Sequence, residues 1–344
     1  MTTEVQLHRD GRAGRIVLDR PRALNSLTHG MLTAVRAALD AWAADDTVAT
    51  VVLTGAGERG LCAGADIRAI HDDARAGGAG ARAFFRHEYE LNALIARYPK
   101  PYVAVMDGIT MGGGVGLSAH GGVRIVTERS TVAMPETRIG LVPDVGGSRL
   151  LARAPGELGT HLGLTAAAMD AGDALACGFA DHFVPGERLK GFTDALATLD
   201  AAEAVREFAV AAPVGALAPQ REWIDACYAA DTVEEILDRL LSSGVPEAKE
   251  AAEQILAKSP TALKVTLAAL RRAARLDSLE AVLDQEYRVS CAALDSHDLV
   301  EGIRAQVVDK DRNPRWSPAT LAGVSEADVA RFFASRGADE LGLA

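Results

Sequence analysis

Residues 108–118 read GITMGGGVGLS, the most informative short segment of the chain. Three consecutive glycines, Gly112, Gly113 and Gly114, stand directly before a segment that is expected to be helical. Because glycine has no side chain, the N–H groups that emerge at the helix start are open to a ligand oxygen. The stretch therefore predicts a place that stabilises an oxyanion or a phosphate; close packing of the helix on a strand is the alternative reason for the glycines. It has neither the Gly-Lys-Ser/Thr of a P-loop nor the glycine spacing of a dinucleotide site.

Short β-branched runs alternate with helical stretches around this segment, from about residue 5 to residue 183. Runs bounded by Gly, Pro or charged residues predict strands, and they cover residues 16–18, 48–53, 102–105, 123–126 and 131–133. A helix is expected to begin near Thr28, because apolar side chains then recur every three or four residues as far as Trp42. This half of the chain is predicted to be α/β.

After about residue 190 the strand signals fade and alanine-rich helical segments follow. Helices are expected over residues 203–211, 233–241, 248–258, 262–275 and 279–293. Asp298 with Glu301 suggests a capping box that opens another helix. Residues 211–219 hold two prolines and a glycine without clear periodicity, which is typical of a linker. We predict an α/β core over residues 1–205 and a helical region over residues 206–344.

A second segment of small residues, LCAGADI at residues 61–67, follows a predicted strand and a Gly-rich turn. Backbone N–H groups that lead into a helix point toward any oxygen placed there, so this segment is a second candidate for a ligand contact. A tight turn between a strand and a helix is the alternative interpretation.

Three carboxylates are candidates for chemistry. Glu136 follows a proline at an expected helix start, and Asp144 lies in the turn PDVGG. The helix dipole and ordinary turn chemistry are the alternative reasons for these two acids. Glu88 shares one face of a predicted helix over residues 82–98 with apolar side chains. Burial there is costly without a partner or a ligand, whereas a Glu at the edge of the apolar stripe would be solvated.

Composition limits the function classes. The chain has 344 residues, 49% hydrophobic and 24% charged, as in an ordinary globular protein. Acidic residues outnumber basic ones by 47 to 36, and the resulting charge of −11 favours neither a nucleic acid nor an anionic membrane as partner. The longest apolar run, residues 208–218, is far below the ~20 residues of a membrane span. The eight histidines show no metal-ligand spacing, so no metal site is predicted.

Four scattered cysteines without a Cys-x-x-Cys pair favour a reducing compartment. The first residues, MTTEVQLHRDGRAG, carry no basic segment followed by an apolar stretch, as a secretory signal would. We therefore expect a cytoplasmic protein.

Taken in order, several motifs resemble those of the crotonase superfamily, also called enoyl-CoA hydratase/isomerase. They are RPRALNSL at residues 20–27, CAGADI at 62–67, KP at 100–101, the triple glycine and MPETRIGLVP at 134–143. More narrowly, GITMGGGVGLS, MPETRIGLVPDVGGS and SHDLVEGIRAQVVDKDRNPRW look like the 3-hydroxyisobutyryl-CoA hydrolases. The similarity runs from about residue 5 to residue 335.

The resemblance implies a crotonase-like spiral of ββα units with two stacked sheets, followed by an enlarged helical region that often mediates oligomerisation. A homo-oligomer is therefore compatible with it. The resemblance also implies that the backbone N–H groups of Ala65 and Gly113 form an oxyanion hole for the carbonyl of an acyl-CoA thioester. Further substrate contacts are expected from Gly112, Ala23, Leu24, Ala63, Asp66 and Ile67. Arg20 and Arg22 are candidates for the CoA phosphates. CoA is part of the substrate, and no separate cofactor is expected.

One departure from the hydratase pattern favours hydrolysis. Hydratases of the superfamily carry two glutamates, one in the helix after the glycines and one in the Pro-Glu segment, which together hold the added water. Here the first position is Gly116, whereas Glu136 keeps the second. Asp144 stands where hydratases commonly have a glycine, and Glu88 fits the substrate-contacting glutamate of the hydrolases.

The hydrolase interpretation gives Glu136 the reaction step, either as a general base that activates water or as a nucleophile that attacks the thioester carbon. Asp144 would orient the water or contact the substrate's 3-hydroxyl, and Glu88 would bind the polar acyl end. The resemblance implies 3-hydroxyisobutyryl-CoA as substrate and a role in valine breakdown. The 3-hydroxypropionyl thioester differs by one methyl, a discrimination worth only ~1–3 kcal/mol, so both are expected substrates. An enoyl-CoA hydratase that uses Glu136 alone and a non-catalytic acyl-CoA-binding protein are the alternatives.

Overall fold

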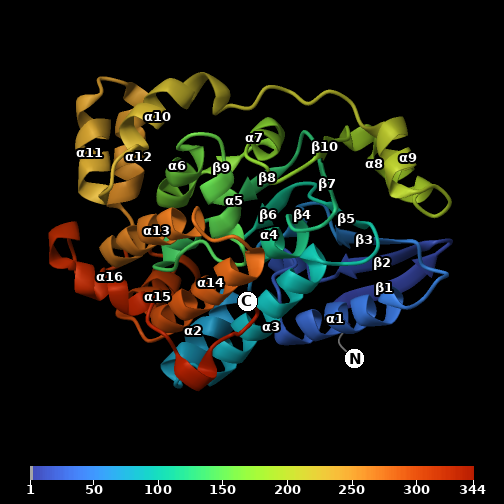
Figure 1. Ribbon diagram of the computed structural model, residues 1–344, viewed down its shortest axis with the longest axis horizontal. Coiled ribbons are helices and arrows are strands. Elements are labelled where there is room, and N and C mark those ends of the chain that lie inside the picture. Colours follow the sequence, from blue (N-terminus) through green and yellow to red (C-terminus); the bar gives the residue numbers. More distant parts are fainter. Residues whose placement is uncertain (1–2) are drawn as a thin grey trace. The chain divides into compact units, whose positions relative to one another are not determined.

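The computed structural model describes residues 3–344 (Figure 1). These residues group into two compact units, each built from several stretches of the chain. Unit 1 takes the chain up to residue 65 together with residues 90–133 and 169–216, and unit 2 takes residues 66–89, 134–168 and 217–344. The two units therefore alternate along the chain. The division into an α/β core and a helical region after residue 205 stays a prediction.

The main sheet of unit 1 has six strands in the order β1-β2-β3-β5-β7-β10. They are β1 (Val5–Asp10), β2 (Ala13–Leu18), β3 (Thr50–Gly55), β5 (Tyr102–Val105), β7 (Val123–Val126) and β10 (His182–Phe183). Strands β1 and β2 pair antiparallel, and the other neighbours pair parallel. Parallel strands are buried on both faces, which is why β3 and β5 begin with continuous buried runs, with Val52 opposite Val103. The strands predicted over these residues are confirmed, although β3 begins at Thr50 instead of residue 48.

A second sheet joins much shorter strands in the order β4-β6-β8-β9. They are β4 (Gly60–Cys62), β6 (Ile109–Met111), β8 (Thr131–Ala133) and β9 (Ala168–Met169). Strand β6 pairs parallel with both β4 and β8, and it ends directly before the triple glycine. Of these strands the sequence predicts only β8; with two or three residues each, the strands are too short for alternation to be a dependable signal. Two sheets in a mixed α/β chain agree with the predicted fold class.

Helices cover the main sheet of unit 1. Helix α1 (His29–Ala43) begins where the sequence predicts it, and the Thr28 hydroxyl accepts a hydrogen bond from the Met31 N–H at 3.3 Å. Helices α8 (Gly186–Ala195) and α9 (Ala201–Phe208) contribute Phe192 and Ala204 to a core cluster with Val52, and Leu196, which caps the end of α8, belongs to it too. Two short helices, α4 (Gly113–Ser118) and α7 (Ala171–Ala176), complete the unit.

Unit 2 is helical. It contains α2 (Ile67–Arg75), the first part of α3 (Ala79–Ala96), α5 (Gly147–Arg153), α6 (Leu158–Thr165), α10 (Arg221–Tyr228), α11 (Val233–Ser242), α12 (Pro246–Leu256), α13 (Pro260–Ala273), α14 (Leu279–Leu294), α15 (His297–Ile303) and α16 (Glu326–Phe332). From residue 217 on, every regular element is helical, as the sequence predicts. Val265 and Ala269 of α13 pack with Val289 of α14 in one core cluster of this unit. None of the helices within residues 3–344 is long and apolar enough to cross a membrane.

The predicted capping box of Asp298 and Glu301 is wrong. Helix α15 begins two residues earlier, after the cap Ser296, whose hydroxyl accepts from the Leu299 N–H at 3.4 Å. Asp298 is buried instead, and its carboxylate accepts hydrogen bonds from the Ser259 hydroxyl at 2.5 Å and the Ser317 N–H at 2.8 Å. A carboxylate with such distant partners serves tertiary packing, which the local sequence pattern cannot reveal.

Candidate active site

The triple glycine forms the start of α4 in unit 1. Gly112 caps the helix with φ +50° and ψ −121°, a conformation open to glycine and strained for other residues. A Cβ on Gly114 would lie 2.4 Å from the Cys62 carbonyl oxygen, so this glycine is required by the close approach of α4 to β4. Packing therefore explains Gly114. The N–H of Gly113 is the first of its helix and has no acceptor within it, so it can serve a ligand oxygen.

The LCAGADI segment brings a second set of amides to the same place in unit 1. Gly64 has φ +96°, and a Cβ there would lie 3.5 Å from the Gly113 nitrogen and 3.2 Å from the Met111 carbonyl oxygen. The backbone around Ala65 is therefore adjacent to that around Gly113. This is the juxtaposition that a two-amide oxyanion hole needs, although the roles of Ala65 and Gly113 themselves stay predictions.

The predicted CoA-contacting residues Ala23 and Leu24 belong to this part of unit 1 as well. The Leu24 carbonyl accepts a hydrogen bond from the Ala63 N–H at 3.0 Å. Leu24 and Asn25 both have positive φ, at 53° and 54°, and Asn25 is buried. The Asn25 amide donates to the Leu61 carbonyl at 3.1 Å and accepts from the Arg20 N–H at 2.9 Å, and it thereby joins the two segments. The sequence does not reveal this role of Asn25, because the Leu61 carbonyl that it binds lies 36 residues away.

Other residues that were predicted to contact the substrate have structural roles. Asp66 is the cap of α2 in unit 2, and its carboxylate accepts from the Ala69 N–H at 3.4 Å, while Ile67 is the first residue of that helix. The Arg20 guanidinium is engaged with Glu4 at 2.9 Å and with the Ser26 carbonyl at 2.6 Å, which disfavours it as a phosphate ligand. Arg22 is exposed.

Three predicted carboxylates, Glu88, Glu136 and Asp144, are brought together in unit 2. Their exposed fractions are 1%, 6% and 5%. Glu136 begins a 3₁₀ turn (Glu136–Ile139) after Pro135, where a helix start was expected. Within residues 3–344, Oε2 of Glu136 and Oε1 of Glu88 have no hydrogen-bond partner. A buried carboxylate oxygen without a protein partner is costly, and this points to a ligand or water that it serves. The alternative of a solvated Glu88 is wrong.

Asp144 is held differently. Its Oδ2 accepts a hydrogen bond from the Tyr89 hydroxyl at 2.6 Å, and that hydroxyl is also 2.7 Å from the Ser290 hydroxyl. Tyr89 is fully buried on α3, next to Glu88 in the chain. The sequence does not single out Tyr89, because a tyrosine inside an apolar helix face is more often part of the core.

The acids influence one another electrostatically. Burial raises the pKa of Glu136 well above its usual range, and the charges of Asp144, Glu286 and Glu88 raise it further. Burial raises the pKa of Asp144 to about 6, while the hydrogen bond from Tyr89 acts in the opposite direction. Burial and the charge of Asp144 likewise raise the pKa of Glu88. A carboxylate whose pKa is raised toward neutral pH, as that of Asp144 is, is suited to general acid–base chemistry.

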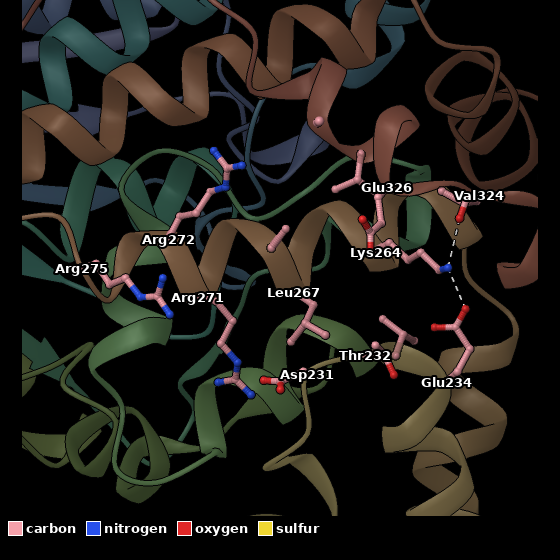
Figure 2. Close-up of a pocket in the computed structure, with 14 residues that line it drawn as sticks. Asp231, Thr232, Glu234, Lys264, Leu267, Arg271, Arg272, Arg275, Val324 and Glu326 are labelled. Carbon is pink, nitrogen blue, oxygen red and sulfur yellow. Dashed lines mark hydrogen bonds and ion pairs between the residues drawn. The ribbon is translucent and has the colours of Figure 1, made fainter.

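A separate cavity of about 570 Å³ in unit 2 is lined by α13 and by the first turns of α11 and α16 (Figure 2). Figure 2 shows Lys264 between the Glu234 carboxylate, at 2.6 Å, and the Val324 carbonyl, at 3.1 Å. Arg271 pairs with Glu157 at 3.0 Å. None of the predicted site residues lines this cavity, so it is not part of the candidate active site.

Residues 13–333 match the family described as Enoyl-CoA hydratase/isomerase. The chain belongs to this family. Among its curated relatives, the mitochondrial 3-hydroxyisobutyryl-CoA hydrolase of Danio rerio is 43% identical over 344 residues, which cover 97% of this chain and 90% of that protein. The Homo sapiens protein of the same name is 40% identical over 349 residues, 98% of this chain and 90% of that protein. The resemblance found in the sequence motifs is confirmed.

Solved structures of the enoyl-CoA hydratase/isomerase family share the fold over almost the whole chain. A carnitinyl-CoA dehydratase from Mycobacterium thermoresistibile is 54% identical, with a TM-score of 0.96 and 99% of both chains covered. An enoyl-CoA hydratase from Rhodobacter sphaeroides 2.4.1 is 44% identical, with a TM-score of 0.94 and 98% of this chain and 99% of that chain covered. The crotonase-like fold is confirmed. The names of these relatives differ in reaction, so the names alone do not define the chemistry of this chain.

Proposed function

We propose that the chain hydrolyses 3-hydroxyisobutyryl-CoA to 3-hydroxyisobutyrate and CoA. The observation that carries this proposal is the set of acids. Glu136 is buried with an unpartnered oxygen beside Asp144 and Glu88, while α4 has Gly116 and no acid anywhere between Gly113 and Ser118. A single glutamate lacks the partner that would hold water for addition to a double bond, yet it suffices for attack on a carbonyl. Relatives at 40–43% identity over nearly the whole chain carry the hydrolase name, which supports the proposal.

In this reaction the thioester carbonyl accepts hydrogen bonds from the N–H groups of Ala65 and Gly113. Oriented donors stabilise the negative charge that develops on the carbonyl oxygen, by about 3 kcal/mol for each donor. Glu136 either removes a proton from the attacking water or attacks the carbon itself and forms a mixed anhydride, which water then cleaves. In both cases the C–S bond breaks and the thiol of CoA leaves. Asp144 orients the water or the 3-hydroxyl, and Glu88 binds the polar acyl end.

The test is an assay of CoA release, by thiol detection, from a panel of short acyl thioesters. Release is expected from 3-hydroxyisobutyryl-CoA and from 3-hydroxypropionyl-CoA, because one methyl gives little discrimination. Hydrolysis in ¹⁸O water under single-turnover conditions then addresses the two routes, since only the anhydride route can place label in Glu136.

The second candidate is an enoyl-CoA hydratase that uses Glu136 alone. The names of the two structural relatives favour it. Crotonyl-CoA hydration, followed by loss of the enoyl absorbance, is therefore measured beside CoA release. Hydration without CoA release would exclude the hydrolase. CoA binding without turnover of any thioester would leave a non-catalytic binding protein.

We further propose that hydrolysis serves valine breakdown in the cytoplasm. The four cysteines are buried and free of disulfides, which favours a reducing compartment. The curated relatives carry the word mitochondrial in their names, and cell fractionation with an antibody to the chain separates the two locations. The absence of a cofactor or metal and a homo-oligomeric state stay predictions, and metal analysis and light scattering of the purified chain test them.

A further inference from the structure

The Asp144 turn, residues 144–147, has a strained backbone. Val145 has φ +53°, a left-handed conformation that a β-branched residue rarely adopts, and Gly146 follows with φ +78°. A Cβ on Gly147 would lie 2.5 Å from the end of the Met134 side chain, so the turn is also tightly packed. Such a conformation persists only where surrounding groups hold it.

Glu286 of α14 is the group that holds this turn. Its Oε2 accepts a hydrogen bond from the Gly146 N–H at 2.6 Å, and its Oε1 accepts from the Ser148 N–H at 3.0 Å and the Ser148 hydroxyl at 2.5 Å. Glu286 is 1% exposed and forms no ion pair within residues 3–344. Burying a carboxyl group without a cation is costly, and the three donors from Gly146 and Ser148 offset part of that cost.

Ser290 lies one turn further along the same face of α14 and contacts the hydroxyl of Tyr89, which in turn contacts the Asp144 carboxylate. The Tyr89 hydroxyl has one proton, which it donates to Asp144, so the Ser290 hydroxyl must donate to Tyr89. Ser290 is fully buried. One face of α14 thus fixes both the backbone after Asp144 and the orientation of its carboxylate.

We propose that Glu286 and Ser290 are positioning residues that hold Asp144 in its reactive geometry. This inference rests on the proposed function, in which Asp144 orients the water or the 3-hydroxyl. Neither residue touches the substrate in this proposal. Glu286 acts through the Asp144 turn, and Ser290 acts through Tyr89.

The experiment compares Glu286→Gln and Ser290→Ala with wild type, with 3-hydroxyisobutyryl-CoA as substrate. Glutamine keeps one acceptor oxygen but turns an NH₂ group toward a backbone N–H, so the turn should shift. We expect kcat to fall about 10²-fold, as a small misplacement of a reacting group does. KM should stay within about threefold, because the substituted residue itself does not touch the substrate. Ser290→Ala should lower kcat by about tenfold, also with little change in KM.

Asp284→Asn is the matched control. Asp284 lies on the same helix and accepts hydrogen bonds from the Leu343 and Ala344 N–H groups at 3.0 and 3.1 Å. These hydrogen bonds do not involve the Asp144 turn. Its kcat should equal that of wild type. If Glu286→Gln and Ser290→Ala both match this control, the inference is overturned. If Glu286→Gln does not fold, Ser290→Ala alone decides.

The failure of the proposed function gives a different result. In that case the wild-type chain itself releases no CoA from any short acyl thioester. A crystal structure of Glu286→Gln then decides the geometric claim, since Val145 should leave the left-handed region. An unchanged Asp144 turn in that structure would contradict the role of Glu286.

Discussion

At the scale of single residues, Glu136 combines two properties that a structural carboxylate rarely has. It is buried, and its Oε2 has no hydrogen-bond partner within residues 3–344. If Glu136 had only a structural role, the folded protein would be more stable with an apolar residue at this position or with a hydrogen-bond donor beside the carboxylate. We therefore expect Glu136→Gln to lower kcat for CoA release by about 10²- to 10⁴-fold while the protein stays folded.

Circular dichroism and the unfolding midpoint of Glu136→Gln check the fold, and thiol detection checks the activity. Glu207→Gln is the control, because Glu207 is an exposed glutamate of α9 and should behave like wild type. Near-normal turnover by a folded Glu136→Gln would remove Glu136 from the reaction.

The sequence predicts the acids of the site better than the groups that hold them. Glu136 and Asp144 lie in short motifs with distinctive neighbours, so local spacing singles them out. Glu286 sits in an ordinary helix, and its partners lie 138 and 140 residues away in the chain. Tyr89 meets Ser290 at a separation of 201 residues. Contacts of this range depend on packing, which no local pattern encodes.

At the scale of secondary-structure elements, the start of α4 depends on its contact with β4. A Cβ on Gly114 would be 2.4 Å from the Cys62 carbonyl oxygen and 3.0 Å from the Cys62 Cβ, so Gly114→Ala must displace the helix. The displacement moves the neighbouring Gly113 N–H, and loss of one such donor costs about 3 kcal/mol of transition-state stabilisation. We expect kcat/KM for CoA release to fall by about 10²-fold or more, together with a lower unfolding midpoint.

Gly122→Ala is the control for this substitution. A Cβ on Gly122 would meet nothing within 4 Å, and its φ is not positive. Activity and midpoint should therefore match wild type. A Gly114→Ala variant with wild-type kcat/KM would contradict the claim that the close packing of α4 on β4 positions the Gly113 N–H.

Elements with many residues are predictable for a physical reason. Helices α11 and α14 begin at Val233 and Leu279, the residues that the apolar spacing indicates, because ten or more residues average out local exceptions. Strands β4 and β6 have three residues each, and these residues are extended because they pair with each other across almost 50 residues of sequence. Asp298 is another case, because its hydrogen-bond partners Ser259 and Ser317 lie 39 and 19 residues away, so the local pattern wrongly predicts a helix cap.

At the scale of the whole molecule, unit 2 encloses four acids without an ion pair among residues 3–344. They are Glu88 on α3, Glu136 at the 3₁₀ turn, Asp144 in its turn and Glu286 on α14. Tyr89 donates to Asp144 and Ser148 donates to Glu286, while Ser290 contacts the Tyr89 hydroxyl. Placing like charges together in a buried site costs stability, and proteins accept such a cost at functional sites.

This arrangement predicts how stability depends on pH. Burial raises the pKa of Glu286 to about 8, although hydrogen bonds from Ser148 and Gly146 oppose the shift, whereas a glutamate in the unfolded chain titrates near 4.3. Between these values the folded state binds more protons than the unfolded state, so the free energy of unfolding falls as pH rises. The contribution of Glu286 to the free energy of unfolding is fully present below pH ~4 and is lost as the pH rises through about 8.

Other groups titrate in the same range, so the decisive quantity is a difference between two proteins. Burial lowers the pKa of His161 to about 4, which makes stability rise with pH up to about 6.5 and opposes the acids. Subtracting the free energy of unfolding of Glu286→Gln from that of wild type, by urea titration at pH 5 to 8.5 and constant ionic strength, cancels His161. The difference should decline steadily with pH, by about 1.4 kcal/mol for each pH unit between the two pKa values of Glu286. A difference that is constant or grows with pH would mean that Glu286 is ionised throughout, held so by its three donors.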